Sequence, residues 1–254
     1  MIEYVIQLGS GAPRIGPPPT GTDASVWSLD TAADTVGGYR VEEAAAVLDA
    51  GESEKAARLL LPGHRHRYIA AHLGLRVLLG ARLGLDPREV ALVREDCPCC
   101  GGPHGRPAVA GGGVHFSLSH SGDLAYFALA AVPVGVDIEE TPDADAVADV
   151  LASLHPVESA ELTALPAPRR PGALARLWCR KEACLKAAGT GLARGLAEPY
   201  VGSAPAPAAV TGWILTDLPA PEGYAAALAV ADHHDQGQHQ NQHQGHDRER
   251  ENPT

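Results

Sequence analysis

Aromatic residues and positive charges are both scarce in this chain. Aromatic side chains make up 4% of the 254 residues, with only two Phe and three Trp, so the core has to be built mainly from aliphatic side chains. Lys and Arg number 20 against 31 Asp and Glu, which gives a formal net charge of −11. Because broad nucleic-acid binding needs a positive contact surface, this balance argues against nucleic acid as a partner.

Long hydrophobic runs are also missing from the sequence. No uninterrupted apolar stretch reaches the roughly 18 residues of a membrane span, and the first residues lack the basic and apolar pattern of a signal peptide. The five cysteines, at positions 97, 99, 100, 179 and 184, are odd in number and lack the spacing of a secreted disulfide scaffold. We therefore expect a cytoplasmic protein with reduced thiols and no membrane partner.

Composition divides the chain into two tails and a globular part. Residues 1–24 contain several Gly and Pro and predict a flexible extension, while the His- and Gln-rich residues 233–254 predict a disordered tail. Residues 25–132 and 133–232 each show strands, then helices, then strands. This order favours an α+β fold with an N-terminal and a C-terminal subdomain of similar design.

Hydrophobic periodicity predicts the individual elements. Helices are expected over Glu42–Leu61, Arg65–Leu83 and Ala173–Ala188, with one or two short helices between Asp145 and Leu165 that break at Pro156. Short strands are expected at Val26–Leu29, Val90–Val93, Val114–Ser119, Leu124–Ala131, Val134–Glu139, Val210–Leu215 and Tyr224–Val230. The sequence Ser121-Gly122-Asp123 predicts a hairpin turn between two of these strands.

Three acidic residues from two separate segments are candidates for a metal site. Asp137 and Glu139 stand two residues apart in an apolar, β-branched run, so a strand would place them on one face, where buried carboxylates need a partner. In the following long helix, Glu182 and Lys186 are four residues apart, so acid and base project from one face. The alternatives are an ordinary exposed Glu182–Lys186 pair and acids at Asp137 and Glu139 that are solvated or paired with Arg.

Two further segments have residue types that suit an anion. His120 follows a run of alternating Ser residues at the end of a predicted strand, and Ser119 next to it would point to the opposite face, which favours phosphate binding by His120 over a Ser–His nucleophile pair. Arg65 and Arg67 open a predicted helix, where backbone N–H groups also attract anions. A solvated basic turn is the alternative for these arginines.

The loop Cys97-Pro98-Cys99-Cys100-Gly101-Gly102-Pro103-His104 contains a C-x-x-C pair with a nearby histidine. A structural zinc site takes four ligands, and the sequence has no second C-x-x-C pair. From the sequence we therefore favour a tight loop with reduced thiols over a zinc site.

Taken in order, four motifs resemble the 4'-phosphopantetheinyl transferases of the Sfp type. They are Gly105-Arg106-Pro107, Phe116-Ser-Leu-Ser-His-Ser-Gly122, Gly135-Val-Asp-Ile-Glu139 and Trp178-Cys-Arg-Lys-Glu-Ala-Cys-Leu-Lys186-Ala-Ala-Gly189. The resemblance covers Trp27 to Val230 and leaves only the two tails outside. It implies two subdomains related by pseudo-twofold symmetry, with coenzyme A in the cleft between them.

The resemblance also implies roles for single residues. Mg²⁺ would be held by Asp137, Glu139 and Glu182, and Lys186 would contact a phosphate. The nucleotide end of coenzyme A, with its 3'-phosphate, would be bound by Ser119, His120, Arg106, Arg65 and Arg67. The chain departs from the family pattern at Arg106, Thr190 and Tyr68, where relatives often have lysine, lysine and threonine.

The implied reaction moves 4'-phosphopantetheine from coenzyme A to a serine of an apo acyl or peptidyl carrier protein, with release of 3',5'-ADP. Glu182 would accept the serine proton, directly or through water, in a protein that acts as a monomer. The form Trp178-Cys-Arg-Lys-Glu-Ala183 is similar to the branch that serves polyketide and nonribosomal peptide synthetases. The alternatives are a Mg²⁺-dependent phosphohydrolase that uses the same acids and a non-catalytic protein that binds coenzyme A or a carrier.

Overall fold

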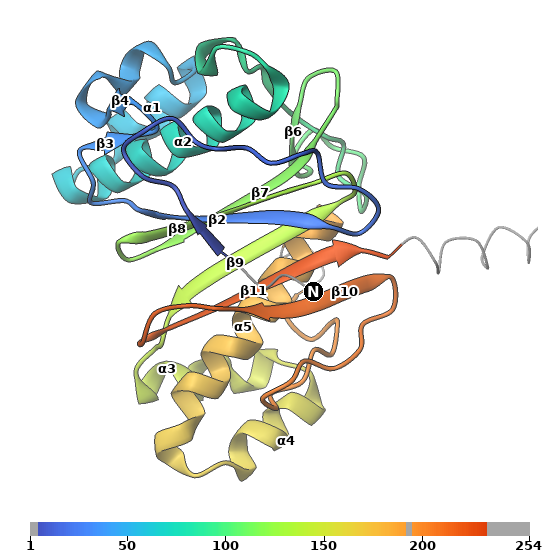
Figure 1. Cartoon of the computed structure of the whole chain (residues 1–254). Helices are drawn as coiled ribbons and strands as arrows, with labels where there is room; N and C mark the ends of the chain where they lie inside the picture. The colour runs from blue at the N-terminus through green and yellow to red at the C-terminus, as the bar shows by residue number, and fades with distance from the viewer. Residues whose placement is uncertain (1–4, 192–194, 233–254) are drawn as a thin grey trace, which may run out of the picture.

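The computed structural model describes residues 5–191 and 195–232 and has its two largest β-sheets between two long helices (Figure 1). The N-terminal sheet has the strand order β1 (Val5–Gln7), β2 (Ala24–Asp30), β8 (Leu124–Ala130), β7 (His115–Ser121). The C-terminal sheet has the order β10 (Trp213–Leu218), β11 (Tyr224–Ala231), β9 (Val134–Glu140). Helix α2 (Pro62–Leu83) covers the outer side of the first sheet, and helix α5 (Arg170–Ala188) covers the outer side of the second.

Three apolar clusters hold these layers together. Alternate residues of β8 divide between two of them: Phe127 packs with the residues of α2, while Ala128 packs against Val136 of β9. The third cluster joins α5 to β11 and includes Leu177 and Ala227, which are both fully buried. The period-two alternation of the strands therefore builds one core between the sheets and one under each helix.

Shorter elements complete the chain. Those of the N-terminal part are β3 (Thr35–Val36), β4 (Tyr39–Arg40), η1 (Val41–Ala46), α1 (Ala50–Arg58), η2 (Pro87–Glu89), β5 (Leu92–Arg94) and β6 (Pro107–Val109). Those between β9 and α5 are α3 (Ala144–Val150), η3 (Leu151–Ser153), α4 (Pro156–Ala164) and η4 (Ala167–Arg169). Pro156 is the first residue of α4, a position where its missing N–H group costs nothing.

The mixed α/β class expected from the sequence is confirmed, and both long helices end at the predicted residues, Leu83 and Ala188, each followed by a glycine in the left-handed conformation. Gly84 follows α2 with φ +70°, and Gly189 follows α5 with φ +73°. Strands β7 and β8 form the predicted antiparallel hairpin around Gly122. A pseudo-twofold relation between the two halves stays a prediction.

One predicted helix is wrong. Residues Glu42–Leu61 were expected to form a single helix, but the structure has the short 3-10 helix η1 followed by α1. Asp49 divides them, because its side chain accepts the N–H of Glu52 at 2.8 Å while the Glu52 carboxylate accepts the N–H of Asp49 at 3.0 Å. This reciprocal pair is a helix start signal, and it ends the preceding helix.

The N-terminal segment also differs from the flexible extension that composition suggested. Val5–Gln7 pairs in parallel with Val26–Ser28 of β2, and Leu8 is buried in the cluster under α2. The segment is held by backbone hydrogen bonds to β2 and by the buried side chain of Leu8. Its Gly and Pro content gave no indication of either contact. Strand β10 begins at Trp213, three residues later than Val210, which forms only an isolated bridge.

Helix α5 carries two basic side chains that are fully buried and paired. Arg180 Nη2 lies 2.6 Å from Asp217 Oδ2, and Lys181 Nζ lies 2.7 Å from Glu158 Oε2. Lys181 also donates to the carbonyl of Pro199 at 2.6 Å. Because an unpaired buried charge is costly, these pairs anchor α5 to α4 and β10.

Gly135 in β9 allows α5 to approach this strand very closely. A Cβ atom at this position would lie 2.0 Å from the carbonyl oxygen of Ala183 and 2.6 Å from the amide nitrogen of Ala187. No side chain fits in that space, so the backbones of strand and helix are in direct contact. This contact brings Asp137 and Glu139 of β9 next to Glu182 of α5.

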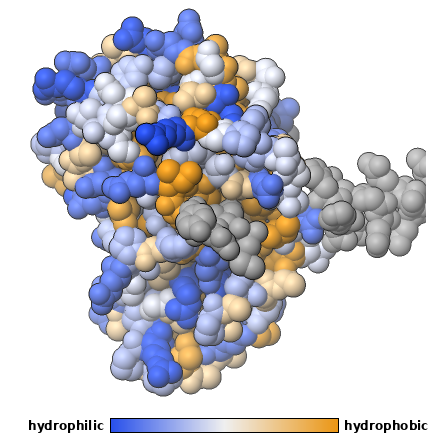
Figure 2. Space-filling model, in the orientation of Figure 1, coloured by the Kyte–Doolittle hydropathy of each residue, from blue (hydrophilic) through white to orange (hydrophobic). Residues whose placement is uncertain are grey.

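The surface around this framework is mostly polar. Figure 2 shows hydrophobic residues mainly in the middle of the face seen in Figure 1, where β1 and β10 lie. Ile6 of β1 and Ile214 of β10 are among the exposed large hydrophobic residues. Within the described ranges, none of the helices has the length and apolar character of a membrane span.

Replacing Gly135 with Ala should destabilise the protein strongly, because a backbone carbonyl has to move to admit the methyl group. We expect a loss of at least about 2 kcal/mol, or roughly 5 °C in Tm, measured by calorimetry. Gly172→Ala, a position in α5 with nothing within 4 Å of a new Cβ, is the matched control and should be neutral or stabilising by up to about 1 kcal/mol. Equal Tm values for the two variants would contradict the close contact.

Candidate active site

A row of three serines joins the two sheets at the edge where β7 meets β9. Ser117 Oγ accepts the N–H of Val136 at 3.0 Å. Ser119 Oγ donates to Asp137 Oδ1 at 2.7 Å, and Ser121 Oγ donates to Glu139 Oε2 at 2.8 Å. Strand alternation sends these three side chains, which we call the serine row (Ser117, Ser119, Ser121), to one face of β7. Through Ser119 and Ser121 the row orients Asp137 and Glu139 of β9.

A cavity of about 380 Å³ lies where these acids meet helix α5. We call it the acidic cavity, and its lining consists of Leu118, Ser119, His120, Asp137, Glu139, Trp178, Glu182 and Lys186. The structure therefore brings together all three acids that the sequence singled out. Lys186 is the cation beside them, since its Nζ lies 2.6 Å from Asp137 Oδ1.

The donors in the acidic cavity fit a hard divalent cation. Asp137 is 1% exposed, and its Oδ2 atom is buried without a hydrogen-bond partner. A buried carboxylate oxygen without a partner is a ready ligand, and Mg²⁺ prefers carboxylate oxygen. The ligand oxygens of Asp137, Glu139 and Glu182 do not all lie within 4.8 Å of one another. Binding of one ion by all three would therefore have to draw them closer.

Burial and the negative charge of Asp137 raise the pKa values of Glu139 and Glu182. Burial raises the pKa of Glu139, and the nearby negative charge of Asp137 raises it further. Burial likewise raises the pKa of Glu182, again with a contribution from Asp137. Ionised carboxylates crowded in this way favour a cation between them.

A second, larger cavity of about 710 Å³ adjoins the acidic cavity and shares Leu118, His120 and Lys186 with it. Basic residues from both halves line it, and they are Lys55, His72, Arg94, His104, Arg106, His120 and Lys186. Its apolar and aromatic lining includes Tyr68, Leu75, Leu92, Phe116 and Leu185. Positive charge beside apolar surface suits an anionic ligand with an uncharged portion.

Two histidines of the large cavity, His72 and His120, favour the neutral form. Burial lowers the pKa of His72 to about 4, and the cations Lys55 and Arg76 add to this effect. Burial also lowers the pKa of His120, with further contributions from Lys186 and Lys55. Neutral imidazoles can donate hydrogen bonds to a phosphate, while the lysines and arginines supply the charge.

The predicted anion-binding residues do not all line the large cavity. Arg106 lines the large cavity, where its Nη1 donates to the carbonyl of Ala187 at 2.8 Å and its Nε lies 2.7 Å from Glu95 Oε2. Arg65 and Arg67 do not line it. Arg65 donates to the carbonyl of Leu59, and Arg67 Nε lies 2.6 Å from Asp123 Oδ1 on the β7–β8 turn. Ser119 faces the acidic cavity, so its contact is the carboxylate of Asp137.

Sequence reasoning missed the other basic groups of the large cavity. His72 lies one helical turn after Tyr68 in α2, and its ring stacks on that of Tyr68 with centroids 3.9 Å apart. Lys55 in α1 places its Nζ 5.3 Å from the Tyr68 ring centroid. The i, i+4 spacing of Tyr68 and His72 was the available signal, whereas the position of Lys55 depends on how α1 folds against α2.

Comparison with known proteins indicates one family for this chain. The family model of the 4'-phosphopantetheinyl transferase superfamily matches residues 133–229, the segment that holds all three acids and Lys186. The chain is 33% identical over 202 residues to 4'-phosphopantetheinyl transferase HetI of Nostoc sp., and this alignment covers 76% of this chain and 82% of the relative. It is 29% identical over 149 residues to a 4'-phosphopantetheinyl transferase of Bacillus subtilis, covering 58% of this chain and 62% of the relative.

Because the pKa of Glu182 is raised above its ordinary value of 4.5, its ionised form costs stability in the folded protein without metal. The cost is present above the raised pKa and disappears below 4.5, where the carboxyl is protonated in both folded and unfolded states. Glu182→Gln should therefore raise Tm near pH 7 in EDTA, and the gain should vanish as the pH falls toward 4. Thermal melts across this range would show it, and a gain that grows on acidification would contradict the assigned environment.

Proposed function

The chain belongs to the 4'-phosphopantetheinyl transferase superfamily, and on this premise we propose that it transfers 4'-phosphopantetheine from coenzyme A to a serine of an apo acyl or peptidyl carrier protein. The second product is 3',5'-ADP. The observation that carries the proposal is the connection of the large cavity with the acidic cavity through Leu118, His120 and Lys186.

Each cavity suits one part of this substrate. The cations and neutral histidines of the large cavity match the phosphates of the nucleotide end, and its apolar lining offers contacts for the base. Lys186 lies between the two cavities, in position to contact the pyrophosphate. The acidic cavity then receives the phosphate that is attacked, together with the hydroxyl of the carrier serine.

Asp137, Glu139 and Glu182 would hold Mg²⁺ in this cavity, and the ion would supply neutralisation of charge on the pyrophosphate. The serine row keeps the first two acids oriented through the hydroxyls of Ser119 and Ser121. The serine oxygen of the carrier forms a bond to the β-phosphorus as the bond to the 3',5'-ADP oxygen breaks. Glu182 accepts the serine proton, a role that its raised pKa supports.

The carrier partner is proposed to belong to polyketide or nonribosomal peptide synthesis, because the motif Trp178-Cys-Arg-Lys-Glu-Ala183 resembles the branch that serves those pathways. A monomer in the cytoplasm fits a substrate site built from two halves of one chain and a substrate, coenzyme A, found inside cells. The pathway of the carrier, the monomeric state and the cytoplasmic location remain predictions.

The activity is tested by intact-protein mass spectrometry of an apo carrier protein incubated with this protein, coenzyme A and Mg²⁺. We expect the carrier to gain one phosphopantetheinyl group, and EDTA should prevent the gain. Consumption of coenzyme A at the same rate without a carrier would indicate a phosphohydrolase instead. Binding of coenzyme A without transfer to any of several carrier types would indicate a non-catalytic binding protein.

Asp137→Asn and Glu182→Gln should each reduce kcat by roughly 10²- to 10³-fold, because each removes charge from the proposed metal site. Asp149→Asn, which alters an exposed acid on α3 that lines neither cavity, is the matched control and should keep full activity. Transfer at the normal rate by Glu182→Gln would show that both roles assigned to Glu182 are wrong.

Ser119→Ala should weaken Mg²⁺ binding more than it lowers the rate at saturating Mg²⁺. The substitution removes a hydrogen bond to Asp137 but leaves the carboxylate in place. We expect the Mg²⁺ concentration for half-maximal rate to rise roughly tenfold, with the rate restored at high Mg²⁺. A variant that stays slow at every Mg²⁺ concentration would assign Ser119 directly to the substrate. Ser159→Ala, on α4 away from both cavities, controls for the loss of a hydroxyl.

A further inference from the structure

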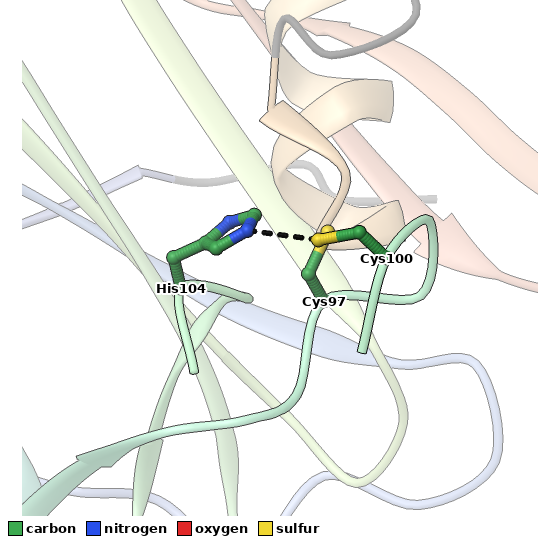
Figure 3. A group of neighbouring side chains, drawn as sticks. All are labelled: Cys97, Cys100 and His104. Atoms are coloured by element: carbon green, nitrogen blue, oxygen red, sulfur yellow. Dashed lines mark hydrogen bonds between the residues drawn. The ribbon is translucent and has the colours of Figure 1, made fainter. Parts of the chain in front are cut away.

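The loop between β5 and β6 gathers three soft metal ligands at the rim of the large cavity (Figure 3). Sγ of Cys97, Sγ of Cys100 and a ring nitrogen of His104 all lie within 4.8 Å of one another. Cys97 is 3% exposed, while Cys100 and His104 are exposed. Cys100 Sγ and His104 Nε2 are 3.0 Å apart and point toward each other.

The backbone of this loop is shaped around the Cys97 sulfur. The N–H groups of Cys99 and Cys100 hydrogen-bond to it, and the N–H of Gly101 donates to the Cys97 carbonyl at 2.8 Å. The turn closes through the N–H of Cys97, which donates to the carbonyl of Gly102 at 2.7 Å. The turn therefore holds the Cys97 sulfur on the side of the loop where the ligand atoms of Cys100 and His104 lie.

Two glycines make room for this arrangement. Gly101 has φ +69°, a left-handed conformation that lets the chain reverse directly after Cys100. A Cβ at Gly102 would lie 3.0 Å from His104 Cδ2 and 3.1 Å from His104 Nε2. The missing side chain leaves the space in which the imidazole approaches the sulfur of Cys100.

We propose that Cys97, Cys100 and His104 bind one zinc ion, with the fourth coordination position open to water. Two thiolates and one imidazole are the donors that Zn²⁺ favours over Mg²⁺. Tetrahedral bonds of about 2.3 Å to sulfur and about 2.0 Å to nitrogen separate those atoms by about 3.6 Å. The observed 3.0 Å between Cys100 Sγ and His104 Nε2 requires only a small opening.

Zinc at this position would order the chain that leads into the large cavity. His104 is followed by Gly105, where a Cβ would lie 2.5 Å from the carbonyl of Glu95, and then by Arg106. The Gly105 N–H donates to the same carbonyl at 2.9 Å. The metal would thus restrain the segment directly before Arg106, which contacts α5. Its role would be to hold this segment in place, and it would take no part in the transfer reaction.

The test is spectroscopic titration of the full-length, reduced protein with Co²⁺, followed by displacement with Zn²⁺. Co²⁺ bound through thiolates gives an intense near-ultraviolet charge-transfer band, whereas the oxygen ligands of the acidic cavity and the His-rich C-terminal segment do not. We expect this band at one Co²⁺ per chain and its loss on adding Zn²⁺. Cys97→Ser and Cys100→Ser should each weaken binding by roughly a hundredfold or more, and His104→Ala by at least roughly tenfold.

Cys99→Ser is the matched control, because its sulfur belongs to the same loop but not to the ligand group, and it should keep the band. The proposal is overturned if the reduced wild-type protein gives no thiolate band, or if the band survives both Cys97→Ser and Cys100→Ser. Loss of the band in Cys99→Ser alone would also overturn it. Thermal melts provide a second readout: Zn²⁺ should raise the Tm of wild-type protein and of Cys99→Ser, but not of Cys97→Ser.

Discussion

The contact between strand β9 and helix α5 at Gly135 sets the geometry of the acidic cavity. With no side chain at this position, the strand lies against the backbone of Ala183 and Ala187. Asp137 and Glu139 follow on the same face of the strand, and Glu182 and Lys186 stand directly beside the contacted residues of the helix. A wider spacing between the two backbones would separate the carboxylates and break the 2.6 Å pair of Lys186 with Asp137.

Repulsion between like charges is concentrated in the acidic cavity, whereas the other charges of the Trp178–Lys186 motif are paired. Three acids with one adjacent lysine leave unbalanced negative charge, which the raised pKa values of Glu139 and Glu182 reflect. Elsewhere on the same helix the buried charges are paired, because Arg180 and Lys181 contact Asp217 and Glu158. Of the charged residues in the Trp178–Lys186 motif, two thus stabilise the fold, and only Glu182 and Lys186 face the cavity. Functional sites commonly carry strain of this kind.

The sequence was sufficient to predict those features that depend on local periodicity. The long helix α5, the β7–β8 hairpin and the shared face of Asp137 and Glu139 all follow from residue spacing. The parallel pairing of β1 and the place of Lys55 beside Tyr68 depend on long-range packing, which no local pattern encodes. Ser119 shows the limit most clearly: the family resemblance implied that it binds the nucleotide end of coenzyme A, and only the junction of the two sheets reveals its hydrogen bond to Asp137.

Arg106 links the two halves of the chain at the mouth of the large cavity. It belongs to the N-terminal half, yet its guanidinium donates to the carbonyl of Ala187 in the last turn of α5, where a cation also favours the negative end of the helix. Glu95 neutralises part of its charge, so a bound phosphate has to share Arg106 with two protein acceptors. The guanidinium has five donors in a planar fork, enough to serve all three, whereas the ammonium group of a lysine has only three. Arginine at this position can therefore keep the two halves together and still bind an anion.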